Sequence, residues 1–181
     1  MPKFGPAGNS ESFSKMGYKN SLDVPDYIVK MGLDCYEYQC GRGVNIGEEK
    51  ARLLGGKAAK AGITLSLHAP YYISMSSTEE EKRDNSVNYI LASARAVNAM
   101  GGDRIVVHTG SCGKISRSDA LDLALDTMRK AIAALDGEGL SNIHICPETM
   151  GKVNQLGTLE EVLELCLLDE RLIPCIDFGH L

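Results

Sequence analysis

The feature that most constrains the fold is a regular alternation along the chain. Short runs rich in β-forming residues alternate with amphipathic stretches at helical spacing from one end of the sequence to the other. Parallel strands need a crossover connection, usually a helix, so this order predicts a parallel sheet with right-handed crossovers. The expected strands are residues 3–5, 35–39, 63–67, 104–107, 143–146 and 173–176.

Helix-start patterns lie between these runs. Residues 77–80 and 158–161 each have the order of a capping box, and a Ser-Arg-Ser-Asp segment at 116–119 precedes a third apolar stripe at helical spacing. Two earlier helices are expected over 26–31 and 48–61. The strand and helix patterns together predict an α/β protein.

Two α/β architectures fit this order, an open doubly wound sheet and a closed (β/α) barrel. After the first strand, residues 5–10 have neither the G-x-G-x-x-G order nor the P-loop order of open nucleotide-binding sheets. Polar residues instead follow nearly every strand, where barrel enzymes place their active sites. We therefore predict a single parallel (β/α) TIM barrel domain over residues 1–181.

The length of the chain limits this barrel. An eight-stranded (β/α) barrel typically takes about 250 residues, whereas this chain has 181. The six expected strands correspond to about six of eight βα units, so a barrel incomplete at its C-terminal side is predicted. Such a barrel would have an open sheet edge, through which copies of the chain could associate.

Composition narrows the classes of function. No stretch approaches the roughly 18 apolar residues of a membrane span, and the N-terminus lacks a secretory pattern, so a cytoplasmic location is expected. The six cysteines have no C-x-x-C pair, which favours buried thiols in a reducing compartment. The net charge of −5 argues against a broad basic surface. A nucleic-acid partner would need local positive charge, such as a bound metal.

Four metal-ligating residue types follow four successive expected strands. His68, His108, Glu148 and Asp177 are separated by 40, 40 and 29 positions, about one βα unit each. Successive strands of a barrel would bring these side chains to neighbouring points on one rim. Two imidazoles and two carboxylates suit zinc, manganese or iron better than magnesium or calcium. Glu148, between His108 and Asp177 in strand order, is best placed to bridge two metal ions.

Each of these residues alone has a structural explanation. A single histidine at a strand end is more often hydrogen-bonded within the fold than a metal ligand, and Asp177 could form a turn. The occurrence of four such residues at four consecutive strand ends favours a metal site. His144 serves as a contrast, because it lies within an expected strand and is assigned to the core or the opposite rim.

The sequence around these residues resembles the endonuclease IV family of apurinic/apyrimidinic endonucleases, within the xylose-isomerase-like TIM barrel superfamily. The motifs that carry the resemblance are HAPY at 68–71, VHTGS at 107–111, PETMG at 147–151 and CIDFGH at 175–180. The resemblance implies an eight-stranded barrel with up to three zinc ions on its C-terminal rim. It also implies cleavage of double-stranded DNA on the 5′ side of an abasic site.

The same resemblance assigns roles to single residues. It implies that His68 and His108 hold one zinc together with Glu148, which bridges to a second zinc also held by Asp177. His180 would be a ligand of the third zinc. Glu148 would be the catalytic residue in an electrostatic and positioning role, with metal-activated water as the nucleophile.

Two further residues correspond to DNA contacts of that family. Tyr71 falls where the family has a tyrosine near the damaged nucleotide. Arg42, in a glycine-flanked loop, falls near the family's arginine that enters the DNA stack, although an arginine in such a loop is often simply solvated.

Two alternative functions remain open on sequence alone. A sugar isomerase or epimerase of the xylose-isomerase-like class would also use carboxylate ligands at strand ends. For either enzyme, Mn²⁺ or Fe²⁺ is possible in place of Zn²⁺. The paired imidazoles of His68 and His108 favour the nuclease. The third hypothesis is a chain that binds metal or DNA without catalysis.

Overall fold

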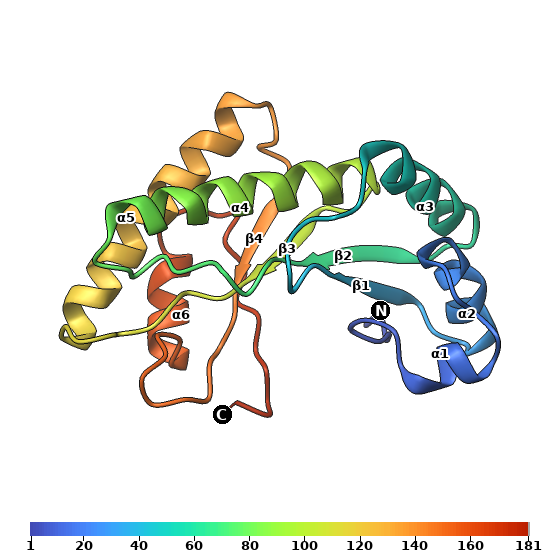
Figure 1. The fold of residues 1–181 in the computed structure, drawn as a ribbon, viewed down its shortest axis with the longest axis horizontal. Helices are drawn as coiled ribbons and strands as arrows, with labels where there is room; N and C mark the ends of the chain where they lie inside the picture. Colours follow the sequence, from blue (N-terminus) through green and yellow to red (C-terminus); the bar gives the residue numbers. More distant parts are fainter. Residues whose placement is uncertain (181) are drawn as a thin grey trace.

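A computed structural model describes residues 1–180 and shows a four-stranded parallel sheet with the strands in chain order (Figure 1). The strands are β1 (Cys35–Gln39), β2 (Thr64–His68), β3 (Arg104–Val107) and β4 (His144–Pro147). The helices that connect them are α3 (Glu48–Lys60), α4 (Glu80–Ala99) and α5 (Arg117–Gly137). Strictly sequential order with one helix per connection is the topology of a (β/α) barrel, as predicted.

Four shorter helical elements complete the architecture. They are α1 (Glu11–Lys15), η1 (Ser21–Asp23) and α2 (Val24–Lys30) before the sheet, and α6 (Leu159–Cys166) after β4. The predictions for α2 and α3 are confirmed, whereas α1 and η1 were not predicted because they are too short to show apolar periodicity.

The first of the six predicted strands is not a continuous strand, and a proline explains why. The segment 4–8 runs parallel to β1, and the N–H groups of Cys35 and Glu37 donate to the carbonyls of Phe4 and Pro6 at 3.3 and 3.1 Å. In a parallel ladder the N–H of Pro6 would donate back to β1, but proline has none. One rung is therefore missing, and only an isolated bridge between Ala7 and Glu37 remains.

The last predicted strand is interrupted in the same way. Along β4, the N–H groups of Ile173 and Cys175 donate to the carbonyls of Ile145 and Pro147 at 3.1 and 2.9 Å. The rung between them would need the missing N–H of Pro147. The prediction of six strands is therefore wrong in detail: the described residues form four strands flanked by two bridge-linked segments, all six in the predicted order.

The helix-start predictions have mixed outcomes. Ser116 caps α5 and Thr158 caps α6, each by accepting a hydrogen bond from the backbone N–H three residues later, and α6 has the full capping box. The predicted box at 77–80 is wrong, because α4 begins at Glu80 with Glu79 as its N-cap. The Ser77 hydroxyl instead accepts from the N–H of Glu79 at 3.2 Å.

The core lies between the sheet and its helices. Leu67, Ile105 and Ile145, one from each of three adjacent strands, are fully buried, and they belong to one cluster with side chains of α3, α4 and α5. Gly55 allows α3 to approach the end of α4, since a Cβ there would lie 2.2 Å from the Met100 carbonyl oxygen. Burial of this apolar surface stabilises the frame that holds the strand ends in register. Among residues 1–180 no helix is long and apolar enough to cross a membrane.

Candidate metal centre

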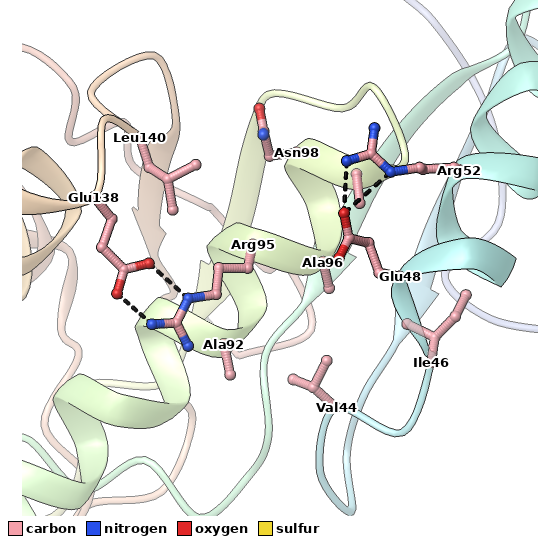
Figure 2. Close-up of a pocket in the computed structure, with 11 residues that line it drawn as sticks. Val44, Ile46, Glu48, Arg52, Ala92, Arg95, Ala96, Asn98, Glu138 and Leu140 are labelled. Carbon is pink, nitrogen blue, oxygen red and sulfur yellow. Dashed lines mark hydrogen bonds and ion pairs between the residues drawn. The ribbon is translucent and has the colours of Figure 1, made fainter.

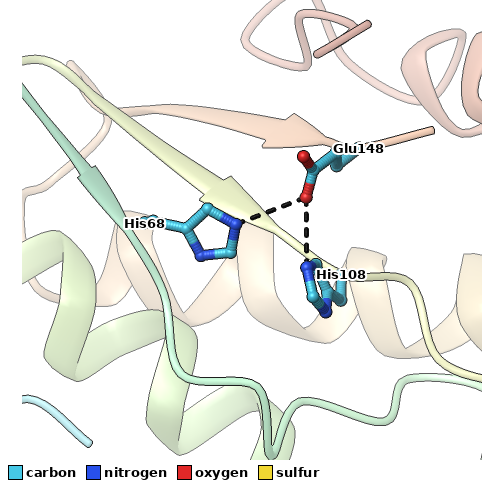
Figure 3. A group of neighbouring side chains, drawn as sticks. All are labelled: His68, His108 and Glu148. Atoms are coloured by element: carbon cyan, nitrogen blue, oxygen red, sulfur yellow. Dashed lines mark hydrogen bonds and ion pairs between the residues drawn. The ribbon is translucent and has the colours of Figure 1, made fainter. Parts of the chain in front are cut away.

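Three metal-ligating side chains lie at the carboxyl ends of three adjacent strands. His68 is the last residue of β2, His108 follows the last residue of β3, and Glu148 follows the last residue of β4. The register pairs His68 with Val106 and Val107 with Pro147, so the three strands end at one level. The sheet therefore delivers the three side chains to the same point on the rim (Figure 3).

Both imidazoles converge on a single carboxylate oxygen. Glu148 Oε2 lies 3.3 Å from His68 Nε2 and 3.1 Å from His108 Nε2. The two imidazole rings stand perpendicular to each other with centroids 5.1 Å apart. One ligand atom from each residue fits within 4.8 Å of the others, which is the spacing of ligands around one metal ion.

The fold fixes the orientation of the His68 ring. His68 Nδ1 lies 3.0 Å from the carbonyl oxygen of Ala69, and a carbonyl can only accept, so Nδ1 carries a proton. This bond directs Nε2 toward Glu148. A histidine that donates one ring N–H to the backbone and presents the other nitrogen to a cavity has the usual arrangement of a metal ligand.

The group formed by His68, His108 and Glu148 is strongly polarised. Burial acts to raise the pKa of Glu148, but hydrogen bonds from His108 and His68 outweigh it and hold this pKa at about 2. For His68, burial acts to lower the pKa, and its bonds to Glu148 and Ala69 outweigh that effect, so the pKa is raised. An ionised, nearly buried carboxylate is thus balanced by imidazole protons, which a divalent cation could replace.

A second group shares the same glutamate. Glu148, Asp177 and His180 also place ligand atoms within 4.8 Å of one another. Thr149 organises them: its hydroxyl accepts from the N–H of Asp177 at 2.9 Å, and its carbonyl lies 2.8 Å from His180 Nδ1. Gly179 donates its N–H to Asp177 Oδ1 at 2.7 Å, which turns the chain so that His180 faces back toward the cluster.

A cavity of about 540 Å³ opens over both groups. Tyr71 forms one wall, with its ring stacked on His108 at 5.2 Å between centroids. The backbone of Gly41 lies against this ring, because a Cβ at Gly41 would lie 2.5 Å from Tyr71 Cε2. The residues that line the cavity are His68, Tyr71, His108, Glu148, Met150, Gly151, Lys152, Gln155, Asp177, Gly179 and His180.

Two of the residues singled out in the sequence lie outside this cavity. Arg42 is exposed in the turn after β1, next to Gly41, and does not line the cavity. His144 begins β4, at the opposite end of the strand from Glu148, and its Nδ1 lies 3.3 Å from the Arg171 carbonyl oxygen. Its assignment away from the strand-end cluster is therefore confirmed.

Sequence reasoning missed several polar residues near the centre. Lys152 and Gln155 line the cavity from the loop after Glu148. Glu37 on β1 is a partly buried acid whose pKa is raised by burial and by the charge of Glu148, against the opposing influence of His68. An acid between Tyr36 and Tyr38, within a predicted strand, was the available indication that its side chain faces the barrel interior.

A second cavity, of about 440 Å³, lies over α4 and has different chemistry (Figure 2). Its charged side chains are mutually compensated, with Arg52 bonded to Glu48 on α3 and Arg95 bonded to Glu138. Within residues 1–180, the two groups that share Glu148 are the clusters with ligand atoms close enough to hold a metal ion. The strand-end cavity is therefore the candidate site.

Zinc, manganese and iron fit this donor set. Both groups consist of imidazole nitrogens and carboxylate oxygens, and thiols of the six cysteines take no part. Imidazole nitrogen suits zinc and iron, and carboxylate oxygen suits manganese, whereas calcium and magnesium favour all-oxygen ligand sets.

A parallel sheet with its strands in strictly sequential order, and with the candidate ligating side chains at the carboxyl ends of the strands, is typical of the class of (β/α) barrels. Residues 25–181 match the family model described as Xylose isomerase-like TIM barrel. The chain belongs to this family.

Curated relatives include proteins named as nucleases. An uncharacterized protein of Methanocaldococcus jannaschii is 33% identical over 163 residues, covering 90% of this chain and 58% of the relative. A "Probable endonuclease 4" of Malacoplasma penetrans is 30% identical over 142 residues, covering 76% of this chain and 48% of the relative. The chain thus spans about half the length of these relatives.

Solved structures confirm the fold and include two types of enzyme. The 3-keto-D-glucoside 4-epimerase of E. coli superimposes with a TM-score of 0.75 at 18% identity, covering 98% of this chain and 69% of the epimerase. Endonuclease IV of Thermus thermophilus gives a TM-score of 0.63 at 19% identity, covering 99% of this chain and 64% of the nuclease. At these identities the likeness concerns the fold alone.

Proposed function

We propose that this chain carries the metal centre of an endonuclease IV-type enzyme, which hydrolyses the phosphodiester on the 5′ side of an abasic site in double-stranded DNA. The observation that carries the proposal is Glu148, whose carboxylate belongs at once to the His68–His108 group and to the Asp177–His180 group. A carboxylate shared by two ligand groups is suited to a multi-metal site, the arrangement common in enzymes of phosphate-ester hydrolysis. The relatives named "Probable endonuclease 4" support the same function.

In this proposal the ligands are divided between the two groups. His68, His108 and Glu148 would hold one zinc, and Glu148 with Asp177 a second, with His180 available to that ion or to a third; manganese or iron could replace zinc. When bound, such ions neutralise phosphate charge and activate water. Glu148 would be the catalytic residue, because its carboxylate could contact both ions and set their separation.

The remaining residues act on the substrate or on the ligands. The Ala69 carbonyl keeps His68 in the tautomer that presents Nε2 to the cavity. Tyr71, 57% exposed and stacked on His108, offers a flat apolar face against a sugar or base of the damaged strand. Arg42, on the exposed turn beside Gly41, would contact DNA at the mouth of the cavity.

A sugar epimerase is the second candidate function. It is favoured by the superposition on the 3-keto-D-glucoside 4-epimerase, whose TM-score exceeds that of the nuclease. Proton transfer on a sugar needs a carboxylate or other base beside the metal, and Glu37 supplies an extra partly buried carboxyl near Glu148. The paired imidazoles of the first group still favour the nuclease.

One experiment separates these functions. The 181-residue protein, loaded with zinc or manganese, is incubated with a labelled duplex that carries one abasic site, and an intact duplex of the same sequence serves as control. We expect chelator-sensitive incision on the 5′ side of the abasic site alone. Turnover of a ketose without incision would assign the epimerase, and metal binding without either activity would leave a binding protein.

A further inference from the structure

One cation lines the metal cavity, and neither ligand group uses it. Among the described residues around this cavity, Lys152 is the single lysine or arginine. Its side chain is exposed, and within residues 1–180 it belongs to no ion pair. Other exposed lysines, such as Lys50 and Lys114, also belong to no ion pair within residues 1–180, so the distinguishing feature of Lys152 is its place at this cavity.

The backbone that carries Lys152 is anchored at several points. The Lys152 carbonyl accepts from the N–H of Gln155 at 2.8 Å, and the Asn154 carbonyl accepts from the N–H of Cys112 at 2.9 Å. The guanidinium of Arg117 donates to the carbonyls of Val153 and Gln155, both at 2.8 Å. The loop is therefore pinned to the segment after β3, and the position of Lys152 beside the cavity is a product of the fold.

A buried acid secures the far end of the loop. Arg117 also forms an ion pair with Glu161, which is 8% exposed. Glu161 Oε2 accepts from the N–H groups of Gly157 and Thr158 at 2.7 and 2.8 Å. Since one guanidinium and one carboxylate together fix both ends of residues 153–158, the loop backbone next to Lys152 needs little ordering when a ligand binds.

The charge of Lys152 has a consequence for the ligand. The two divalent cations of the proposed function would carry more positive charge than Glu148 and Asp177 neutralise, so they would repel a lysine unless a further anion lies between the charges. An uncharged sugar would not provide that anion, whereas a phosphodiester has two non-bridging oxygens, one of which can face the lysine.

We propose that Lys152 binds an anionic phosphate oxygen of the substrate at the edge of the metal cavity. This assignment rests on the proposed function and makes the substrate class more specific, because it requires a phosphate and disfavours a neutral ketose. Lys152 strengthens substrate binding, and it stabilises the bound substrate and the transition state equally.

The test uses inorganic phosphate and an abasic-site duplex as separate probes of the zinc-loaded 181-residue protein. Calorimetry measures phosphate affinity, and fluorescence anisotropy measures duplex affinity over a series of salt concentrations. Lys152→Ala is compared with Lys152→Arg, which keeps the charge, and with Val153→Ala, a matched control on the same loop whose side chain is 94% exposed and does not line the cavity.

We expect Lys152→Ala to weaken phosphate binding about tenfold or more, since a hydrogen bond to a charged group is lost. The slope of log affinity against log salt for the duplex should fall by about 0.9, the value for one phosphate contact. Lys152→Arg should retain most of the affinity, and Val153→Ala all of it. In incision assays Lys152→Ala should raise KM and leave kcat within about threefold.

The outcomes distinguish this proposal from the proposed function. If Lys152→Ala binds phosphate and duplex as Val153→Ala does, or if the wild type binds no phosphate, the role of Lys152 is wrong even where incision is observed. If phosphate binding depends on Lys152 but abasic DNA is not cut, the nuclease is wrong and the phosphate site stands.

Discussion

In two of the molecule's cavities, which are similar in size, the charges are arranged in opposite ways. In the cavity over α4, Arg52 and Arg95 are each bonded to a glutamate, so the charges cancel within the protein. Among the described residues of the strand-end cavity, Glu148 and Asp177 face imidazoles and no arginine, and Lys152 forms no ion pair with an acid.

This difference favours the strand-end cavity as the one that takes a ligand. Internally paired charges need nothing from outside, whereas carboxylates and imidazoles held together without a permanent cation are stabilised by an ion that arrives. The volumes alone, about 540 and 440 Å³, would not have separated the two cavities.

The largest expected effect tests this contrast directly. Glu148→Gln should lower incision by at least about 100-fold and reduce bound metal, because loss of an outer partner of a ligand alone costs about 10–100-fold. The fold should persist, since an amide fills the same space. Activity and metal content are measured together by incision assay and metal analysis.

The matched control is Glu138→Gln, which makes the same chemical change in the compensated cavity. It should leave activity and metal content unchanged. Equal behaviour of the two variants would remove the distinction between the cavities.

The second effect is a pH dependence of metal affinity, which is expected in the strand-end cavity alone. The raised pKa of His68 means that its proton is held to a higher pH than usual, and a metal ligand must lose that proton. Zinc affinity should therefore rise with pH, by about tenfold per unit for each proton released, and level off once the pH exceeds that raised value. Chelator competition between about pH 5.5 and 8, the range in which histidines titrate, measures it. A constant affinity over that range would contradict the role of His68.

A smaller effect is expected at Tyr71, the wall of the strand-end cavity that lies against Gly41. Gly41→Ala places a methyl group against the Tyr71 ring and should displace it, raising KM several-fold with the metal still bound. Gly56→Ala on α3 is the control, because a Cβ there meets nothing within 4 Å. Steady-state kinetics and tyrosine fluorescence check both variants, and unchanged kinetics for Gly41→Ala would show that Tyr71 does not contact substrate.

The smallest effect is expected over α4. Arg95→Ala removes an exposed ion pair, so the midpoint of thermal unfolding should fall by roughly 2 °C or less and incision should not change. Differential scanning calorimetry measures the midpoint. A loss of activity in this variant would indicate that the compensated cavity has a function of its own.

Much of the fold could be predicted from the periodicity of apolar residues, and the ligand groups could be predicted from the position of their residues at strand ends. The strands that are continuous match their predicted ranges within one residue, because apolar runs between helical stripes are local features. The grouping of His68, His108 and Glu148 required only that parallel strands end at one edge.

The features that were missed depend on contacts between distant residues. The missing rungs at Pro6 and Pro147 become visible only when the strand partners are known. The contact between Gly41 and Tyr71 joins positions 30 residues apart, and the anchoring of the Lys152 loop by Arg117 joins positions 36 and 38 residues apart. A single sequence carries no local pattern for such pairs.

Pro174 reduces the number of N–H donors on the side of the segment 172–175 that faces away from β4. Ile173 and Cys175 direct their N–H groups inward to β4, so the residue between them faces outward. That residue is a proline, and the N–H of Leu172, the preceding outward-facing residue, is already donated to Asp169. Over this stretch the outer margin offers carbonyl oxygens and almost no donors. A strand that paired with this side would consequently find few N–H donors along residues 172–174, so the pairing would be weak there.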